Sequence, residues 1–371
     1  MHPGSIPGEA SIVMNAGESI HASAALLPRH GGALAAVAHA YGIARRDLLD
    51  LSTGINPEPW PIPPLPADAF TRLPDPEDLA ALISAARSAY GVAPRTNILA
   101  APGSDIALRL IPTLRPAGHV GILSPTYSGH AEAWRQAGHR VTEIAWSSAT
   151  GPIAEVDAIV LVSPNNPDGR RLEAGGAERL LARLPAHGLL LIDEAFADLD
   201  EKTGLAYRID DPRLVLLRSF GKFYGLAGLR LGFVIGSGPL LARFAALMGD
   251  WPLSGPAVVT GRAALADEAW RVAARQRLGE SRAALDEVLA RHGLNVAGGT
   301  DLFRFLRDSR ARSLHEHLAR AGIWTRIFQT MPDAIRIGLP RAGELPRLAA
   351  ALARWSGAAD TAGHRPMLSD S

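Results

Sequence analysis

Cysteine is absent from this chain of 371 residues. Its absence excludes disulfide bonds, thiolate metal sites and cysteine nucleophiles. Lysine is nearly absent too, because only Lys202 and Lys222 contribute to the 38 lysine and arginine residues. Arginine stays protonated at ordinary pH, whereas a lysine amine can lose its proton and attack a carbonyl group. Lys222, in "RSFGKFYGLAGLRLGFVIG" (218–236), is therefore a candidate nucleophile, whereas Lys202 in "DEKTG" is expected to be a surface residue.

The chain also lacks a charge excess and a long apolar run. Its formal net charge is +1, so no global field draws it to nucleic acid or to an anionic membrane. No stretch approaches the roughly 20 apolar residues of a membrane span. The opening residues lack the basic and apolar regions of a signal peptide. We therefore expect a cytoplasmic globular protein that binds neither nucleic acid nor membranes.

What the chain does contain is an alternation of strand and helix patterns. Apolar runs such as "AIVLVSP" and "GLLLIDEA" are typical of strands buried on both faces, as in the mainly parallel sheets of α/β proteins. The later part has shorter strand patterns and two helices, which indicate a smaller α+β domain. We predict an N-terminal arm and helix (1–50), a large α/β domain (51–255), a connecting helical region (256–292), a small C-terminal domain (293–357) and a disordered tail (358–371).

Polar residues follow five predicted strands, at the ends where open α/β sheets bind their ligands. These residues occur in "APGSD" (101–105), "SPTYSG" (124–129), "SPNNPDG" (163–169), "DEAF" (193–196) and "SFGK" (219–222). Turn chemistry explains any one of these segments. Five of them together predict a shared polar rim along one edge of the sheet.

Two nucleotide-binding patterns are incomplete. Leu216 stands where a P-loop ending in Gly221–Lys222 requires its first glycine. In "VIGSGPLLA", Leu241 occupies the third glycine position of a dinucleotide-binding fingerprint. Neither pattern predicts a nucleotide site.

The spacing of Ser219, Lys222 and Arg230, with Asp193 and "NNPDG" upstream, resembles the fold-type I family of pyridoxal-phosphate enzymes. The match is best with the class I and II aminotransferase branch and covers nearly the whole chain. The resemblance implies a large, mainly parallel-sheet domain, a smaller α+β domain and pyridoxal 5′-phosphate as the cofactor. It assigns Lys222 to the Schiff base with the cofactor and then to proton transfer. It places Asp193 under the pyridine nitrogen, which a carboxylate keeps protonated.

The same resemblance implies a site for the cofactor phosphate. The phosphate would rest on a helix start at Gly103, Ser104 and Asp105, where free backbone N–H groups and the helix dipole favour an anion. Ser219 and Arg230 would complete this cup, the arginine through bidentate contact. Asp105 would contribute through its backbone N–H or through local capping.

Further cofactor contacts are implied, together with two departures from the family pattern. Asn166 would donate a hydrogen bond to the ring hydroxyl oxygen, and Tyr127 would stack on the ring. Many relatives have tyrosine three residues after the aspartate, where this chain has Phe196. Histidinol-phosphate aminotransferases have "YPDP", whose tyrosine contacts the cofactor phosphate across the dimer, but here "RLPDPEDL" places Leu73 there. Both losses weaken cofactor hydrogen bonding and argue against a standard member of that aminotransferase.

The segment "RHGGALAAVAHAYGIARRDLLDLSTGINP" (29–57) resembles the opening of the threonine-phosphate decarboxylases of cobalamin biosynthesis. That group has a His-Gly-Gly element before a helix and a "D-x-S-x-x-I-N-P" run. By this resemblance His30 and Gly31 would approach a phosphate ester, and Asn56 would line the same pocket. Taken alone, the His-Gly-Gly element is equally well explained as a flexible turn before a helix.

Arg326 in "IWTRIF" and Arg336 in "AIRIGLP" lie on predicted strands of the small domain. The resemblance assigns Arg336 to the substrate α-carboxylate. It makes Arg326 a candidate for the substrate phosphate or for a second carboxylate contact. Structural salt bridges are the alternative explanation for both arginines.

The implied reaction is decarboxylation of L-threonine O-3-phosphate, a small phosphorylated amino acid, to (R)-1-amino-2-propanol O-2-phosphate by a homodimer. The motifs do not separate decarboxylation from transamination, because the outcome depends on which Cα bond stands perpendicular to the cofactor ring. An aminotransferase acting on a phosphorylated amino compound such as histidinol phosphate is the alternative. A regulatory binding module of this fold is disfavoured, because no helix-turn-helix pattern precedes "INP".

Overall fold

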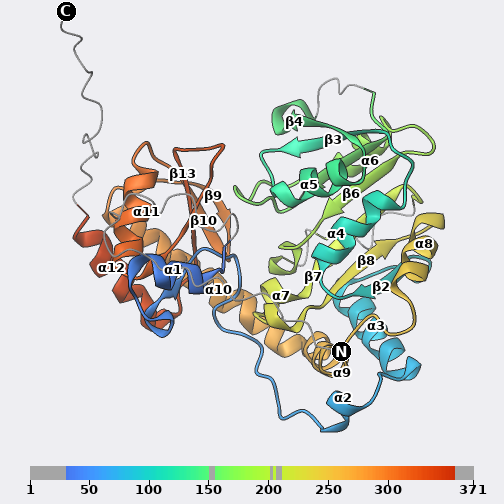
Figure 1. Ribbon diagram of the computed structural model, residues 1–371, viewed down its shortest axis with the longest axis horizontal. Coiled ribbons are helices and arrows are strands. Elements are labelled where there is room, and N and C mark those ends of the chain that lie inside the picture. The colour runs from blue at the N-terminus through green and yellow to red at the C-terminus, as the bar shows by residue number, and fades with distance from the viewer. Residues whose placement is uncertain (1–30, 150–154, 201–203, 206–210, 356–371) are drawn as a thin grey trace, which may run out of the picture.

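The computed structural model describes residues 31–149, 155–200, 204–205 and 211–355 (Figure 1). His30, Lys202, most of the predicted N-terminal arm and the predicted tail lie outside the described residues. The described part contains a large sheet and a smaller sheet, each with its own helices. The boundaries of the five segments given above stay a prediction.

Within the described residues, seven strands form the large sheet in the order β2–β8–β7–β6–β5–β3–β4. Their bounds are β2 (Asn97–Ala101), β3 (His119–Ser124), β4 (Arg140–Ala145), β5 (Ala158–Val162), β6 (Leu189–Asp193), β7 (Leu214–Ser219) and β8 (Gly232–Gly236). Neighbouring strands from β7 to β4 are parallel, whereas β8 runs antiparallel to both β7 and β2. The predicted mainly parallel sheet is confirmed, but the apolar pattern did not indicate that β8 is reversed.

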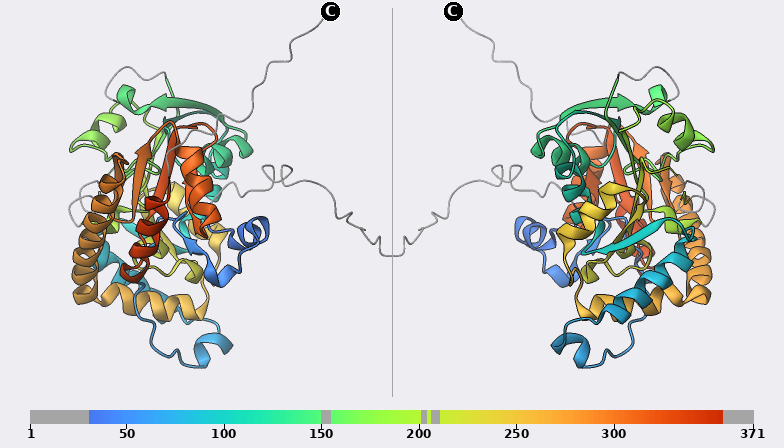
Figure 2. Two further views of the ribbon diagram at one scale, coloured as in Figure 1. Left: turned by 90° about the vertical axis from the view of Figure 1, so that its left-hand side faces the viewer. Right: turned by 90° about the vertical axis from the view of Figure 1, so that its right-hand side faces the viewer.

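The strands are apolar throughout because the sheet has a core on each face. In β5, Ile159 and Leu161 belong to one core, whereas Ala158 and Val160 belong to the other, since successive side chains point to opposite faces. One core is covered by α3 (Pro76–Tyr90), α6 (Gly176–Leu181) and α9 (Gly255–Ala266). The other is covered by α4 (Ser104–Thr113), α5 (Ser128–Gln136) and α8 (Pro239–Met248). The side views show these helices flanking the strands (Figure 2).

The smaller sheet is antiparallel, with the strand order β12–β13–β10–β9. Its strands are β9 (Val296–Thr300), β10 (Phe303–Arg307), β12 (Arg326–Ile327) and β13 (Ala334–Gly338), and its helices are α11 (Ala311–Arg320) and α12 (Leu345–Ala353). The N-terminal elements α1 (Leu34–Tyr41) and β1 (Leu49–Asp50) lie beside it, because β1 pairs in parallel with β11 (Ile323–Trp324). The strand predicted at 323–328 is thus divided at the buried Thr325, since β11 joins β1 and β12 joins β13.

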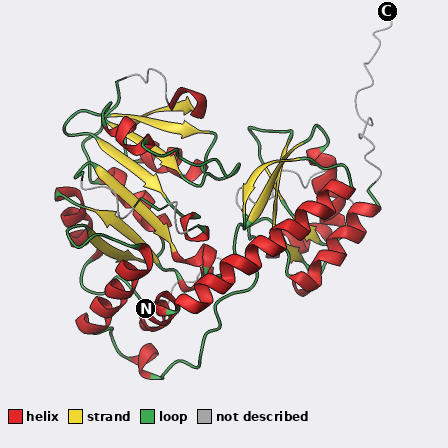
Figure 3. Cartoon of the chain, turned by 180° about the vertical axis from the view of Figure 1, so that it is seen from behind, coloured by secondary structure: helices red, strands yellow, loops and turns green. Residues whose placement is uncertain are grey.

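The predicted helical region at 256–292 consists of two helices, α9 and the 24-residue α10 (Glu268–Arg291). They separate at Asp267, whose Oδ1 accepts a hydrogen bond from the backbone N–H of Trp270 (2.9 Å) and so caps α10. The long helix runs from the large sheet to the small one (Figure 3). The remaining helices are the short α2 (Asp68–Thr71) and α7 (Phe220–Phe223). No helix in the described ranges is both long and apolar enough to cross a membrane.

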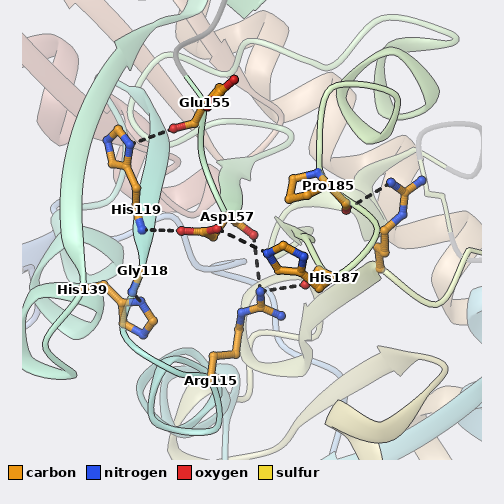
Figure 4. A network of polar contacts seen from close by, with 9 residues as sticks. Arg115, Gly118, His119, His139, Glu155, Asp157, Pro185 and His187 are labelled. Atoms are coloured by element: carbon orange, nitrogen blue, oxygen red, sulfur yellow. Dashed lines mark hydrogen bonds and ion pairs between the residues drawn. The ribbon is translucent and has the colours of Figure 1, made fainter.

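A polar network joins the amino ends of β3 and β5 at the sheet edge opposite the predicted polar rim (Figure 4). The Asp157 carboxylate accepts a hydrogen bond from the backbone N–H of His119 (2.7 Å) and lies 3.5 Å from His187 Nε2. Arg115 donates to the carbonyl oxygens of Asp157 and His187. These contacts hold strand and loop ends together, so we regard this edge as structural.

Candidate active site

A cavity of 1030 Å³ lies at the carboxyl ends of β3, β5, β6 and β7, where the large sheet faces β12 and β13. Its lining contains most of the residues predicted from sequence. From the large sheet and its helices these are Gly103, Ser104, Asp105, Tyr127, Asn166, Asp193, Ser219, Lys222 and Arg230. From the N-terminal segment and the small sheet they are Gly31, Arg326 and Arg336. The polar rim is therefore one continuous site.

Lys222 lies on α7, directly after β7, and is partly buried. Its helix is held by aromatic packing, since Phe220 stacks on Tyr224 (4.3 Å between ring centroids) and Tyr224 stacks on Trp270 (5.6 Å). Burial lowers the pKa of Lys222 from 10.5 to about 8; the charge of Arg336 lowers it further, while Asp193 opposes the shift. A substantial fraction of its amine is therefore uncharged near neutral pH, as a nucleophile or proton acceptor requires.

Asp193 ends β6 and is held from two sides. Its Oδ1 accepts a hydrogen bond from the backbone N–H of Ala195 (3.0 Å), and its Oδ2 lies 3.1 Å from His130 Nε2. His130 is fully buried on α5, and its Nδ1 has no hydrogen-bond partner within the described residues. Sequence reasoning missed His130; the only available signal was its place in the first turn of a helix that starts at the rim.

Two aromatic rings form walls of the cavity. The Tyr127 ring covers Gly129, where a Cβ would lie 2.5 Å from Tyr127 Cε1, and meets His130 edge-on. Burial raises the pKa of the Tyr127 hydroxyl. Phe196 packs edge-to-face on Phe303 with ring centroids 5.2 Å apart. Phe196 therefore supplies an apolar surface, not the hydroxyl of the tyrosine found there in relatives.

An anion cradle forms where α4 begins. A Cβ on Gly103 would lie 2.6 Å from Arg230 Nη2, so the guanidinium packs directly against this helix start. Arg230 has φ +55°, the only positive φ of a non-glycine residue in the described part of the chain. Such a conformation is strained and tends to be kept where function needs it. The Asp105 carboxylate pairs with Arg109 (3.0 Å), and the backbone N–H groups of the first turn of α4, to which Asp105 belongs, have no partner within the helix.

A second positively charged region is formed by Arg326 and Arg336, which stand directly opposite each other on β12 and β13. Arg336 is 7% exposed and donates to Asn166 Oδ1 (2.6 Å) and to the Ser52 carbonyl oxygen (2.7 Å). Burial, followed by the charge of Arg326, lowers the pKa of Arg336 to about 10. The contacts of Arg336 within the described residues are with an amide and a carbonyl oxygen and not with a carboxylate, and like charges that face each other across strands are unfavourable. Arg336 is therefore suited to an external anion.

Asn166 lines the cavity as expected, whereas Asn56 lies outside it. The Oδ1 of Asn166 accepts from Arg336, which leaves its Nδ2 as the donor that a ring oxygen would need. Asn56 does not line the cavity, so the expected substrate contact is corrected. Its Nδ2 donates to the Phe223 carbonyl oxygen (2.8 Å) and its Oδ1 accepts from the Glu58 backbone N–H (2.9 Å). Asn56 instead fixes the chain beside α7.

His315 on α11 is another lining residue that the sequence did not single out. Its Nδ1 lies 2.7 Å from the Thr325 hydroxyl, and its Nε2 has no hydrogen-bond partner in the described segments. Burial lowers the pKa of His315 to about 4, so the ring is neutral at physiological pH. Leu73, by contrast, is 63% exposed and does not line the cavity.

The chain was compared with known families, proteins and solved structures. A family model described as aminotransferase class I and II matches residues 65–352. A threonine-phosphate decarboxylase from Pseudomonas aeruginosa is 44% identical over 312 residues, covering 84% of this chain and 92% of the relative. A histidinol-phosphate aminotransferase from Synechocystis sp. is 30% identical over 327 residues, covering 84% and 93%. The structure of histidinol-phosphate aminotransferase from Sinorhizobium meliloti in complex with pyridoxal-5′-phosphate is similar with a TM-score of 0.74 at 21% identity, covering 86% of this chain and 94% of that one.

Proposed function

Because the chain belongs to the family of class I and II aminotransferases, we propose that it is a pyridoxal 5′-phosphate-dependent enzyme that decarboxylates L-threonine O-3-phosphate. The observation that carries this function is the arginine pair facing the cavity that contains Lys222. Arg230 at the start of α4 supplies one anion site, and Arg326 with Arg336 supplies another. Three anionic groups, the phosphate of the cofactor and the carboxylate and phosphate of the substrate, would then be matched by three arginines.

The cavity residues fit pyridoxal phosphate. The cradle of Gly103, Ser104, Ser219 and Arg230 suits its phosphate, and a side chain at Gly103 would displace the guanidinium. Asp193 would pair with the ring nitrogen from the end of β6. When bound, pyridoxal phosphate supplies an electron sink that accepts the electron pair left when a bond at the substrate α-carbon breaks.

The chain's own residues perform binding, orientation and proton transfer. Lys222 Nζ would hold the cofactor covalently and then, once freed by the incoming substrate amine, deliver a proton to the α-carbon. A pKa near 8 allows this amine to both hold and release a proton close to neutral pH. Arg336 would orient the α-carboxylate that leaves as CO2, and Arg326 would bind the phosphate. One CO2 leaves and one proton replaces it, which gives (R)-1-amino-2-propanol O-2-phosphate, an intermediate suited to cobalamin biosynthesis.

An aminotransferase acting on histidinol phosphate is the second candidate, supported by the 30% identical relative of that name. Both reactions need the same lysine, aspartate and phosphate cradle. The decarboxylase is favoured by the 44% identical relative.

We further propose that the enzyme is a homodimer. Phe70, Leu73 and Trp251 are 68%, 63% and 58% exposed, which is unusual for large apolar side chains. They belong to one region, because α2 packs on α9 and because Pro74 and Trp251 line the same groove. A second copy of the chain would cover this surface. Sedimentation of the wild-type protein as a single 39.2 kDa species at micromolar concentration would contradict the dimer.

The reaction is tested by product analysis. The protein is incubated with pyridoxal phosphate, L-threonine O-3-phosphate and 2-oxoglutarate, and CO2 and glutamate are measured together. We expect CO2 without glutamate. Glutamate without CO2 would replace the decarboxylase by an aminotransferase. Release of neither product would refute both reactions with this substrate.

A further inference from the structure

Ser52 follows β1, is 0% exposed, and uses its hydroxyl and its carbonyl group to join separate parts of the site. Its Oγ donates to Asp50 Oδ1 (2.6 Å) and accepts a hydrogen bond from the backbone N–H of Gly32 (3.0 Å). Its carbonyl oxygen accepts from Arg336 Nη2 (2.7 Å). One small residue therefore contacts both the turn before α1 and the arginine on β13.

The turn at Gly31–Gly32 is seated directly on Ser52. A Cβ on Gly31 would lie 2.6 Å from the Ser52 carbonyl oxygen and 2.8 Å from its Oγ, so only glycine allows this approach. Gly32 has φ +90°, which L side chains rarely adopt. Since Gly31 lines the cavity, the position of Ser52 fixes where this part of the wall stands.

Asp50 orients the Ser52 hydroxyl. Its Oδ1 accepts from both the backbone N–H (2.9 Å) and the Oγ of Ser52 (2.6 Å). The hydroxyl hydrogen is thus directed to Asp50, and an oxygen lone pair is left for the N–H of Gly32. Asp50 is itself in parallel register with Trp324, two residues before Arg326. The contacts of Asp50 and Ser52 therefore connect the Gly31–Gly32 turn with the strands that carry Arg326 and Arg336.

We propose that Ser52 sets the spacing between the Gly31–Gly32 turn and Arg336, and thereby determines the preference for amino acids that carry a second anionic group. In the proposed complex the substrate carboxylate is held at Arg336 while the substrate phosphate, bound by Arg326, lies against the turn. L-threonine lacks the phosphate that would make this second contact. Ser52 is a positioning residue, and this role rests on the function proposed above.

The test compares two ligands in the enzyme loaded with pyridoxal phosphate. The kcat and KM of CO2 release are measured for L-threonine O-3-phosphate, and the inhibition constant of L-threonine is measured in the same assay. Ser52→Ala leaves the buried N–H of Gly32 without its acceptor, so we expect KM to rise roughly 5–30-fold. The inhibition constant of L-threonine is expected to change less than about twofold, because that ligand lacks the phosphate that would lie against the turn.

Partner variants separate positioning from general destabilisation. Asp50→Ala is expected to raise KM at least as much as Ser52→Ala, because the Asp50 carboxylate orients the Ser52 hydroxyl and its charge also acts on Arg336. The charge effect on Arg336 concerns both ligands, so the difference between the ligands still reports on the turn. Asp50→Asn retains an oxygen acceptor and is expected to restore most of the preference. Thr300→Val is the matched control, because it removes another buried hydroxyl that accepts from a backbone N–H, that of Leu302 (3.1 Å), at a position that does not line the cavity.

The failures are distinguishable. A wild-type enzyme that releases no CO2 refutes the proposed function, and the role of Ser52 falls with it. A wild-type decarboxylase whose Ser52→Ala variant keeps its preference refutes only the role of Ser52. An equal loss for both ligands would mean that Ser52 merely supports Arg336. If Ser52→Ala does not fold, Asp50→Ala makes the same comparison, and an unchanged preference in it overturns the inference.

Discussion

Capture of pyridoxal phosphate by the cofactor-free protein should depend on pH through Lys222. Burial is the main cause that destabilises the ammonium form of Lys222, and repulsion by Arg336 and Arg230 adds to it. The pKa of Lys222 therefore falls to about 8. At pH 7.5 about a quarter of the amine is then uncharged, against roughly 0.1% for an ordinary lysine of pKa near 10.5. Only the uncharged amine attacks the aldehyde, which predicts capture roughly 200-fold faster than at an unperturbed lysine.

Stopped-flow absorbance measures this capture directly. The rate is expected to rise about tenfold per pH unit well below pH 8 and to level off roughly one unit above it, because deprotonation is then nearly complete. Arg336→Met removes the largest charge contribution and should move the profile to higher pH. Lys222→Ala is the control and should give no borohydride-trapped adduct. A rate that climbs steadily to pH 10 would refute the perturbed lysine, and an adduct retained in Lys222→Ala would refute its identity.

Three further predictions concern other parts of the molecule. Arg336→Met should raise the KM for L-threonine O-3-phosphate about 100-fold when CO2 release is measured at saturating pyridoxal phosphate; an unchanged KM would exclude carboxylate binding at Arg336. Arg230→Gly should weaken pyridoxal phosphate binding roughly 10–100-fold. It should also raise the free energy of unfolding of the cofactor-free protein by about 1 kcal/mol, because glycine relieves the left-handed strain at this position. Denaturant unfolding measures this change, and a loss of stability would contradict it. The backbone N–H of His119 lowers the pKa of Asp157 below 3.8, so the ionised carboxylate stabilises the fold above that pH and this effect is lost as the pH falls through the lowered value. Asp157→Asn should therefore lower Tm at pH 7 and change it less in acid. A Tm difference that does not depend on pH would contradict this.

The large sheet and the residues that gather at its rim could be predicted because each depends on short stretches of sequence. Buried parallel strands need apolar side chains on both faces, so β5 and β6 are visible as continuous apolar runs. The rim residues follow those runs directly, which places Asp193 and Lys222 at the same edge. The reversal of β8 was not visible, because an apolar strand has the same composition in either direction.

Side-chain direction was harder to predict than position along the chain. Asn56 was expected in the pocket, but its amide is held elsewhere by the nearby backbone N–H of Glu58 and by the carbonyl oxygen of Phe223, a partner that only the fold provides. His130 comes to the site from the first turn of α5 and His315 from the middle of α11, and a single histidine on a helix has no distinctive spacing. The division at Asp267 was recognisable in principle, since aspartate is a preferred helix N-cap.

The length of α10 fixes the separation between the two sheets. At its start Trp270 stacks on Tyr224, beside the helix of Lys222, and near its end Asp286 pairs with Arg304 of β10 (2.7 Å). Each residue of a helix adds 1.5 Å and turns the chain by about 100°. A single inserted or deleted residue between these contacts would swing the small sheet, with Arg326 and Arg336, away from the lysine. Substitutions on the exposed face of α10 should therefore be tolerated during evolution, whereas insertions and deletions within this helix should be eliminated by selection.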